Sequence, residues 1–518
     1  MTTRLRASLL LLPLLAASLL APATADAFCG FYVSGADTTL LNSATQVVLM
    51  REGNRTVLTM QNNYQGPPEG FAMVVPVPVV LMEDNVKVVD DAVFAKIDQL
   101  TAPRLVEYWE IDPCAANAWN NDQNFPNSDG GINNGSSNNG GGNNGVVVEA
   151  QFKVGEYDIV ILSASEGTAL EGWLTANNYQ IPAGSAPHLE PYIQNGSYFF
   201  VAKVDPTKVH FQDGRAVLSP LRFWYDTPTF NLPIRLGLIN ASDVQDLIVY
   251  TLGAQQRYEV SNYPNVTIPT NISVRDEVRT RFGDFYSALF EETLRQNQGA
   301  VVTEYAWDAS TCDPCPGPTL DETDYATLGA DVIGSGDQWR SWTVTRLHAR
   351  YAPGAIGEDM VFKTAPAIVG GREFVINQET GELERGAQPA EFGSDNFQGR
   401  YAIRHRWEGA IACENPVRNR WGGPPGDPYA NNVAGSSPSP NADGGQVNRG
   451  EGVVLSALVA QPIAELGINP DANNGGGNGG GKSASNDDGG CSTTTTQQGL
   501  PIALLLLGLG LLVARRAR

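Results

Sequence analysis

The sequence predicts an α+β fold with mostly antiparallel sheets, packed helices and long polar loops. Apolar, β-branched runs alternate along the chain with short amphipathic segments, which indicates strands and helices in turn. Gly (55) and Pro (33) are abundant and charged residues make up only 17%, which is typical of a β-rich body with loops and untypical of a helical bundle. The 518 residues are 42% hydrophobic, enough for a sizeable core.

Two strands open the body. The apolar runs over 46–60 and 70–81 are separated by a turn-rich segment, so together they predict a hairpin. Pro76 and Pro78 lie in the second run. Because proline cannot donate to a sheet ladder, they predict that this strand is at an edge or bulged.

Helices and further strands follow. Asp90 and Asp91 can cap a helix over 92–100, and Pro103 begins another helix that ends before Asp112. The pattern then predicts strands over 153–162, 197–204, 221–225, 234–239, 246–252, 301–307, 339–351 and 400–413, and helices over 168–177, 187–194 and 276–296. The segment RLVEYWEIDPC (104–114) is similar to VVTEYAWDASTCDPC (301–315). This similarity is compatible with two related lobes and equally with chance.

The first residues have the pattern of a signal peptide. Arg4 and Arg6 form a positive region, 7–20 an apolar core, and 23–27 a small-residue cleavage site. We therefore predict a signal peptide over 1–27, against the alternative of a retained anchor. Phe28 stands where a lipoprotein needs a small residue, which argues against lipidation of the following cysteine.

The last residues predict a transmembrane or sorting segment over 500–518. Residues 500–513 are apolar and short for a bilayer, and an arginine cluster follows at 515–518. With Cys491 before them, they resemble the myxobacterial C-terminal sorting signal (MYXO-CTERM). That resemblance implies processing at Cys491 and display at the cell surface, while the alternative is a permanent membrane anchor. Both place the body outside the cytoplasm.

Composition divides the rest of the chain. We predict an ectodomain over 28–430 with a disordered Asn/Gly-rich insertion at 117–145, and a low-complexity linker over 431–499. The net charge of -22 disfavours nucleic acid as a partner. The expected partners are the export and C-terminal sorting machinery and, through the C-terminal segment, the membrane; the ligand stays open.

Several segments of the body carry a family resemblance. They are FCGFYVSGADTTL, TAPRLVEYWEIDPC, VGEYDIVILSASEGTALEGWLTANNYQIP and WTVTRLHARYAPGAIGEDMVF. Together they resemble the bacterial domain-of-unknown-function family 2330 over roughly 28–413. The resemblance implies an exported protein, often with a C-terminal anchor, and it carries over no activity and no catalytic residue.

The cysteines come closest to chemistry. An exported chain meets an oxidising compartment, so we expect disulfides among the body cysteines. The candidates are Cys29, Cys114, Cys312, Cys315 and Cys413. With Cys491 set aside for processing, five remain, which leaves an odd thiol. We predict at least one long-range bridge from Cys114 to the Cys312/Cys315 segment.

The C-D-P-C sequence has a second interpretation as a redox pair. Thioredoxin-like chemistry needs the first cysteine at a helix N-terminus, whereas Pro314, Pro316 and Pro318 predict a loop. A structural bridge is therefore the preferred interpretation.

Two other sequence features are weaker indications of function. A G-x-x-x-x-G-K-S match at 476–483 lies in low-complexity sequence without a strand or helix, so we interpret it as an accident of composition. His348 and His405 each lie between arginines in a predicted strand and could meet to bind a metal or an anion, but two ordinary strand histidines are preferred. We expect no cofactor, no metal and no catalytic residue.

These observations favour an exported, surface-anchored envelope protein that acts as a non-enzymatic binding or structural ectodomain. Two alternatives stay open. One is an extracytoplasmic hydrolase using Asp/Glu pairs, and the other is a thiol–disulfide protein using the C-D-P-C segment.

Overall fold

The computed structural model describes the chain in segments: residues 31–34, 41–42, 45–61, 64–65, 71–115, 146–177, 179, 185–212, 215–240, 244–334, 341–352, 357–372, 384–426, 433–437 and 447–470. These segments all belong to one compact unit that ends at Asp471. The predicted signal peptide, the 117–145 insertion, Cys29, the 476–483 motif, Cys491 and the 500–518 segment lie outside the described residues. Among the described helices, none combines the length and hydropathy needed to cross a membrane.

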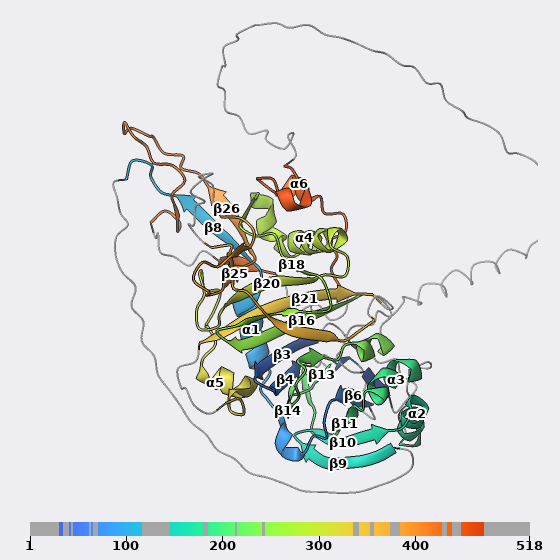
Figure 1. The fold of residues 1–518 in the computed structure, drawn as a ribbon. Helices are drawn as coiled ribbons and strands as arrows, with labels where there is room; N and C mark the ends of the chain where they lie inside the picture. Colours follow the sequence, from blue (N-terminus) through green and yellow to red (C-terminus); the bar gives the residue numbers. More distant parts are fainter. Residues whose placement is uncertain are drawn as a thin grey trace, which may run out of the picture. The chain divides into compact units, whose positions relative to one another are not determined.

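A large central sheet organises the described residues (Figure 1). Its strands, in spatial order, are β24 (Gln388–Pro389), β23 (Ile368–Gly370), β25 (Asn396–Gln398), β20 (Val301–Asp308), β21 (Trp342–Tyr351), β16 (Gln245–Ala254), β3 (Thr45–Glu52), β4 (Arg55–Gln61), β14 (Leu221–Asp226) and β7 (Val86–Val88), with β18 (Asn265–Thr267) paired to β20. The pairs are mostly antiparallel, and β16 with β3 is a parallel exception.

Two five-stranded sheets lie beside it. The β11 sheet contains β1 (Phe31–Ser34), β6 (Phe71–Val77), β11 (Tyr198–Val204), β10 (Tyr157–Ala164) and β9 (Val146–Val154). The β8 sheet contains β19 (Ile272–Val274), β26 (Arg400–His405), β8 (Arg104–Glu110), β27 (Trp421–Gly422) and β28 (Val433–Ser436). The smaller sheets are β15 (Asn231–Leu232), β22 (Met360–Ala365) and β17 (Arg257–Val260); β12 (His210–Gln212) with β13 (Arg215–Val217); and β2 (Leu41–Asn42) with β5 (Tyr64–Gln65).

Helices cover the outer faces of these sheets. The described α-helices are α1 (Ala92–Thr101), α2 (Gly167–Ala176), α3 (Ala186–Gln194), α4 (Phe282–Gln296), α5 (Glu322–Tyr325) and α6 (Leu455–Leu458). In α1, Phe94, Ile97 and Leu100 recur at helical spacing and are buried against the central sheet. The Asp90 carboxylate accepts a 2.9 Å hydrogen bond from Ala92 N, whereas Asp91, the N-cap residue, makes no side-chain capping bond, so the capping prediction holds only in part.

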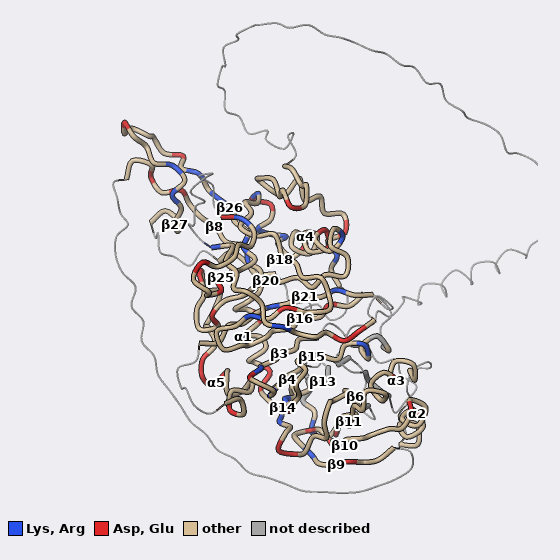
Figure 2. The backbone as a smooth tube through the Cα atoms, in the orientation of Figure 1, with Lys and Arg blue, Asp and Glu red and all other residues tan. Residues whose placement is uncertain are grey.

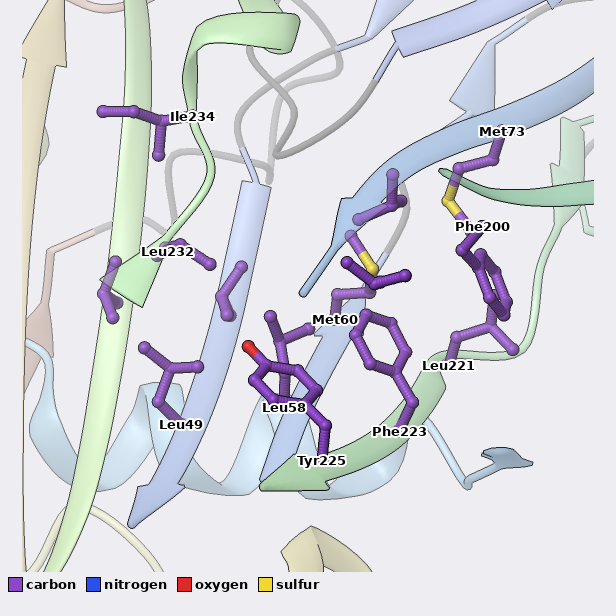
Figure 3. Close-up of a cluster of buried hydrophobic side chains, with 14 of the residues drawn as sticks. Leu49, Leu58, Met60, Met73, Phe200, Leu221, Phe223, Tyr225, Leu232 and Ile234 are labelled. Atoms are coloured by element: carbon purple, nitrogen blue, oxygen red, sulfur yellow. The ribbon is translucent and has the colours of Figure 1, made fainter. Parts of the chain in front are cut away.

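Strand alternation separates two cores. On β3, Val47 and Leu49 face the β11 sheet, whereas Val48 and Met50 face α1. Figure 3 shows the first of these cores, where side chains from β3, β4, β6, β11 and β14 meet. A further cluster lies on the opposite face of the β11 sheet, under α2 and α3. The layers therefore run from α1 and α4 through the central sheet and the β11 sheet to α2 and α3.

The α+β class with mostly antiparallel sheets is confirmed for the described residues, and several element predictions need correction. The hairpin lies within the first apolar run, where β3 and β4 pair around Gly53 with φ +55°. The second run instead forms β6, which pairs with β1 and β11. The pairing of β6 with β1 ends at Val74, so at Pro76 the strand has a neighbour on the β11 side only. The predicted edge position is therefore correct for this end of β6, while the rest of the strand lies between two neighbours.

Four further elements differ from the sequence pattern. The strand expected over 400–413 ends at His405. Residues after Pro103 form strand β8 and no helix, because they pair with β26 and β28 from far along the chain. Residues Arg235–Asn240 form a 3₁₀ helix where a strand was expected. The long helix expected over 276–296 is a 3₁₀ turn followed by α4, with a break at Arg281, whose backbone is not helical.

The predicted linker over 431–499 also needs correction at its start. Residues Val433–Ser436 form β28 on the β8 sheet. Leu458, Val459 and Ile463 then join the apolar cluster under α4. Their burial offsets the entropy of ordering a polar segment, so the compact unit extends to Asp471.

Candidate functional site

The most concentrated set of charges lies inside the fold, on the face of the central sheet that α1 and α4 cover. We call it the buried charge cluster: Asp98, Asp246, Glu304, Arg346, His348 and Arg350. Its basic members occupy alternate positions of β21, so all three project to one face. A bulge in β20 between Thr303 and Tyr305 inserts Glu304 opposite them.

His348 is at the centre of this cluster. Its Nδ1 lies 2.7 Å from Glu304 Oε1, and its Nε2 lies 3.3 Å from Asp246 Oδ1, an ion-pairing distance without hydrogen-bond alignment. The ring of Phe290, from α4, stacks on the imidazole with centroids 3.9 Å apart. Tyr286, one turn earlier on α4, donates its hydroxyl to Glu304.

The two arginines complete the pairing. Arg346 donates to Glu304 Oε2 at 2.6 Å and to Asp98 Oδ1 at 2.5 Å, which links β21 to α1. Arg350 makes a two-pronged contact with Asp246 at 2.7 and 2.8 Å and a 2.8 Å bond to Glu291 on α4. The cluster therefore joins three strands to both covering helices.

Electrostatics hold these groups ionised. Burial favours the neutral form of Glu304, but His348 and Arg346 outweigh it and lower its pKa to about 2. The pKa of Asp246 is likewise lowered, because Arg350 and His348 outweigh burial. Burial alone would lower the pKa of His348, and the two carboxylates raise it instead. A general acid needs a carboxyl with a raised pKa, so Glu304 and Asp246 are tuned in the opposite direction.

Asp395 is a carboxyl group that keeps its proton to a higher pH than an ordinary aspartate. Burial raises its pKa to about 6. Its Oδ1 accepts a hydrogen bond from Ile368 N at 2.9 Å and lies 3.6 Å from Arg257 Nε. Glycoside hydrolysis uses a pair of carboxyl groups that flank the scissile bond. The described partners of Asp395 are a backbone amide and an arginine, and no second carboxylate is among them.

A different kind of site lies where β8 and β26 end. We call residues 104–115 and 400–422 the arm; β8 and β26 run side by side there, and basic residues gather around them (Figures 1 and 2). Cys114 and Cys413 form a disulfide across 299 residues of sequence, with Cα atoms 5.5 Å apart. A bridge that closes so long a loop stabilises the fold by roughly 6 kcal/mol in the chain-entropy account.

Glu110 fixes the loop that follows β26. Its buried carboxylate accepts hydrogen bonds from Trp407 N at 3.0 Å and Asn419 N at 2.8 Å, and Arg418 lies 3.0 Å away. The fixed loop nevertheless presents apolar side chains to solvent: Ile411 is 45% exposed and Val417 is 53% exposed. The loop is thus held by Glu110 and exposes two apolar side chains.

The C-D-P-C segment forms a second, very short disulfide loop. Cys312 and Cys315 are bonded, with Cα atoms 4.9 Å apart. The same chain-entropy account gives roughly 2 kcal/mol for a loop of this size. The predicted bridge from Cys114 to this segment is therefore wrong, since Cys114 pairs with Cys413. Sequence separation alone could not distinguish these pairings.

The two strand histidines do not meet. His405 on β26 lies 2.8 Å from Glu107 and stacks on Trp109, with centroids 4.8 Å apart, while His348 belongs to the buried charge cluster. Within the described segments, no group of three or more His, Cys, Asp or Glu side chains is arranged to hold a metal. Asp246 and Glu304 were missed at the sequence level, although each is a carboxylate within an otherwise apolar strand, a pattern that indicates a buried ionic partner.

Comparison with protein families matches residues 22–363, more than half of the chain, to uncharacterized proteins conserved in bacteria (DUF2330). The chain belongs to this family. The part of the chain that matches DUF2330 contains Cys114, Cys312 and Cys315 and ends before Cys413. It also ends about fifty residues earlier than the resemblance stated from the sequence.

Other comparisons add little to the family assignment. No curated protein matches the chain. A solved structure, the crystal structure of baculovirus P35, is similar with a TM-score of 0.23 and 9% identity, covering 63% of this chain and 97% of that chain. At that TM-score the likeness carries no argument.

Proposed function

We propose that this DUF2330 protein is exported and held at the cell surface, where it acts as a non-enzymatic binding or structural ectodomain. The observation that carries the proposal is the Cys114–Cys413 disulfide, which joins parts of the chain 299 residues apart. Such bridges persist in oxidising compartments and are rare in the cytosol. The N-terminal pattern at 1–27 and the sorting-like segment at 500–518 support the same location.

The chemistry of the buried charge cluster supports a structural role for it. Its carboxylates are paired with Arg346, His348 and Arg350 and have lowered pKa values. Removing one partner from such a buried set leaves an uncompensated charge, so the set fixes which residues of the strands and helices meet. The cluster thus ties β16, β20 and β21 to α1 and α4.

The arm is the surface that we assign to binding. Its loop is braced by the disulfide and by Glu110, and it exposes Ile411 and Val417. Bracing reduces the ordering entropy that a partner would otherwise have to offset on binding. Export places this loop where another envelope component can reach it.

Surface labelling of intact cells, followed by mapping of the terminal peptides, tests the location. The whole gene is expressed, and we expect a membrane-impermeant amine reagent to label its protein product on intact cells. The labelled protein should begin at Asp26 or Phe28. A Cys491→Ala variant should keep its 500–518 segment if Cys491 is the processing point. Labelling that requires cell lysis, on a protein that still begins at Met1, would refute the proposal.

A further inference from the structure

The Cys312–Cys315 loop is already fixed by contacts that do not involve sulfur. Arg104 Nη1 donates to Pro314 O at 2.7 Å, Gln398 Nε2 donates to Asp313 O at 2.7 Å, and Gln99 Nε2 donates to Pro316 O at 3.0 Å. Leu320 N also bonds Ala309 O at 3.1 Å, which closes the base of the loop. The loop would therefore keep its position without the disulfide, which itself closes too few residues to restrain the unfolded chain strongly.

Two buried guanidinium groups lie beneath this loop. Arg104 and Arg400 stand directly opposite each other on β8 and β26, and both are fully buried. Arg104 donates to the Pro314 and Leu100 carbonyls, and Arg400 donates to the Tyr108 hydroxyl. The 2.7 Å bond to Pro314 O sets the Arg104 guanidinium directly against the segment between the two cysteines. Arg104 therefore brings positive charge to the loop itself.

Positive charge beside a cysteine pair stabilises a thiolate, and it can replace the helix N-terminus that thioredoxin-like sites use. The next helix, α5, begins at Glu322, so the loop has no helix dipole of its own. Cys315 is exposed, while Cys312 is half-buried against the cluster under α1. An incoming thiolate can thus reach the Cys315 sulfur more easily than the Cys312 sulfur.

We propose that the Cys312–Cys315 disulfide is a thiol–disulfide exchange site that accepts two electrons from an exposed dithiol of another exported polypeptide. In the first step a substrate thiolate attacks Cys315 Sγ, a mixed disulfide forms, and the Cys312 sulfur leaves as a thiolate. The second substrate thiol loses its proton and attacks the substrate sulfur of the mixed disulfide. The substrate then carries a disulfide, the Cys315 sulfur leaves as a thiolate and takes up a proton, and the protein holds the reduced pair.

The test uses the full chain with glutathione as the redox buffer and a short peptide carrying two cysteines as substrate. In a buffer of reduced and oxidised glutathione, we expect Cys312 and Cys315 to equilibrate while the chain stays folded. The Cys114–Cys413 bridge in the same molecule is the internal control and should stay oxidised. Oxidation of the peptide should be about tenfold faster or more with the natural chain than with the C312S/C315S variant, given an exchange site of this kind.

Charge variants separate this site from an exposed but inert bridge. Asp313→Asn removes a negative charge from the loop, so it should shift the equilibrium toward the reduced pair by about threefold to tenfold. Asp205→Asn, in the turn just after β11, is the control and should leave it unchanged. The proposal is overturned if the C312S/C315S variant oxidises the peptide as fast as the natural chain, or if the pair is reduced only when the whole chain unfolds.

Discussion

At the residue scale, the charges of greatest consequence are those that never reach solvent. Glu304 contacts His348, Arg346 and Tyr286 at once, from a bulge in an otherwise apolar strand. The sequence shows the basic half of this set as RLHAR, but its acidic partners Glu304, Asp246 and Asp98 lie 42, 104 and 248 residues away. Which strand lies beside β21 is decided by tertiary pairing, so the partners could not be assigned from local pattern.

Replacing Glu304 by Gln should destabilise the protein by about 3 to 5 kcal/mol. The substitution leaves Arg346 and His348 buried without their shared carboxylate, while the shape of the side chain is kept. Chemical denaturation followed by tryptophan fluorescence measures the free energy of unfolding. The matched control is Glu291→Gln, because Glu291 also pairs with an arginine of the cluster but is 43% exposed. The control should cost less than about 1 kcal/mol, and equal losses in the two variants would contradict the assigned role of Glu304.

His348 should make the stability of the fold depend on pH. Its pKa is raised above 6.5, so the stability from its proton is fully present below pH 6.5 and is lost as pH rises through the folded-state pKa. Glu304 has a lowered pKa, so its contribution is present above pH 4.5 and is lost as pH falls toward about 2. The contribution of the cluster is therefore largest between pH 4.5 and 6.5.

The His348→Gln variant isolates the histidine term. Asp395 has a pKa raised to about 6, so its contribution to stability is lost as pH rises from 3.8 to 6. This loss is the same in the natural chain and in the His348→Gln variant. We expect the difference in unfolding free energy between the natural chain and the variant to shrink as pH rises above 6.5. A difference that stays constant from pH 5 to pH 9 would show that His348 does not titrate as described.

At the scale of elements, local pattern succeeded where a segment packs through its own periodicity. The helix expected over 92–100 is α1, and the strand expected over 197–204 is β11. It failed at β8, because Pro103 and the residues after it also fit a helix start, whereas pairing with β26 fixes them as a strand. The arm itself could not be derived, since its two strands are separated by almost 300 residues.

The binding role of the arm can be tested by photocrosslinking on intact cells. A photoreactive residue at Ile411 should form adducts with another envelope component, because that position is exposed on a braced loop. Met82 is the matched control, since it is 47% exposed against 45% for Ile411 and lies next to a 3₁₀ turn at the edge of the central sheet. Equal adduct yields at the two positions, or none at Ile411, would count against the arm as a binding surface.

At the scale of the whole molecule, one segment that its composition predicts to be a linker is packed into the fold. Residues 447–470 belong to the polar tract that predicts a linker, yet Leu458, Val459 and Ile463 complete the cluster under α4. A few apolar residues at suitable spacing are enough to dock a polar segment, and composition averages conceal them. The prediction that the body cysteines form disulfides is confirmed for four of the candidates. The predicted partner of Cys114 was wrong, because Cys114 is bonded to Cys413.

We propose an ectodomain that is closed by the Cys114–Cys413 disulfide outside the cytoplasm. Non-reducing peptide mapping of the protein isolated from intact, surface-labelled cells tests this claim most directly, with free thiols alkylated before lysis. We predict a linked peptide pair containing Cys114 and Cys413 in the surface-labelled fraction. Recovery of both cysteines as alkylated free thiols, in protein that is labelled only after lysis, would contradict the account.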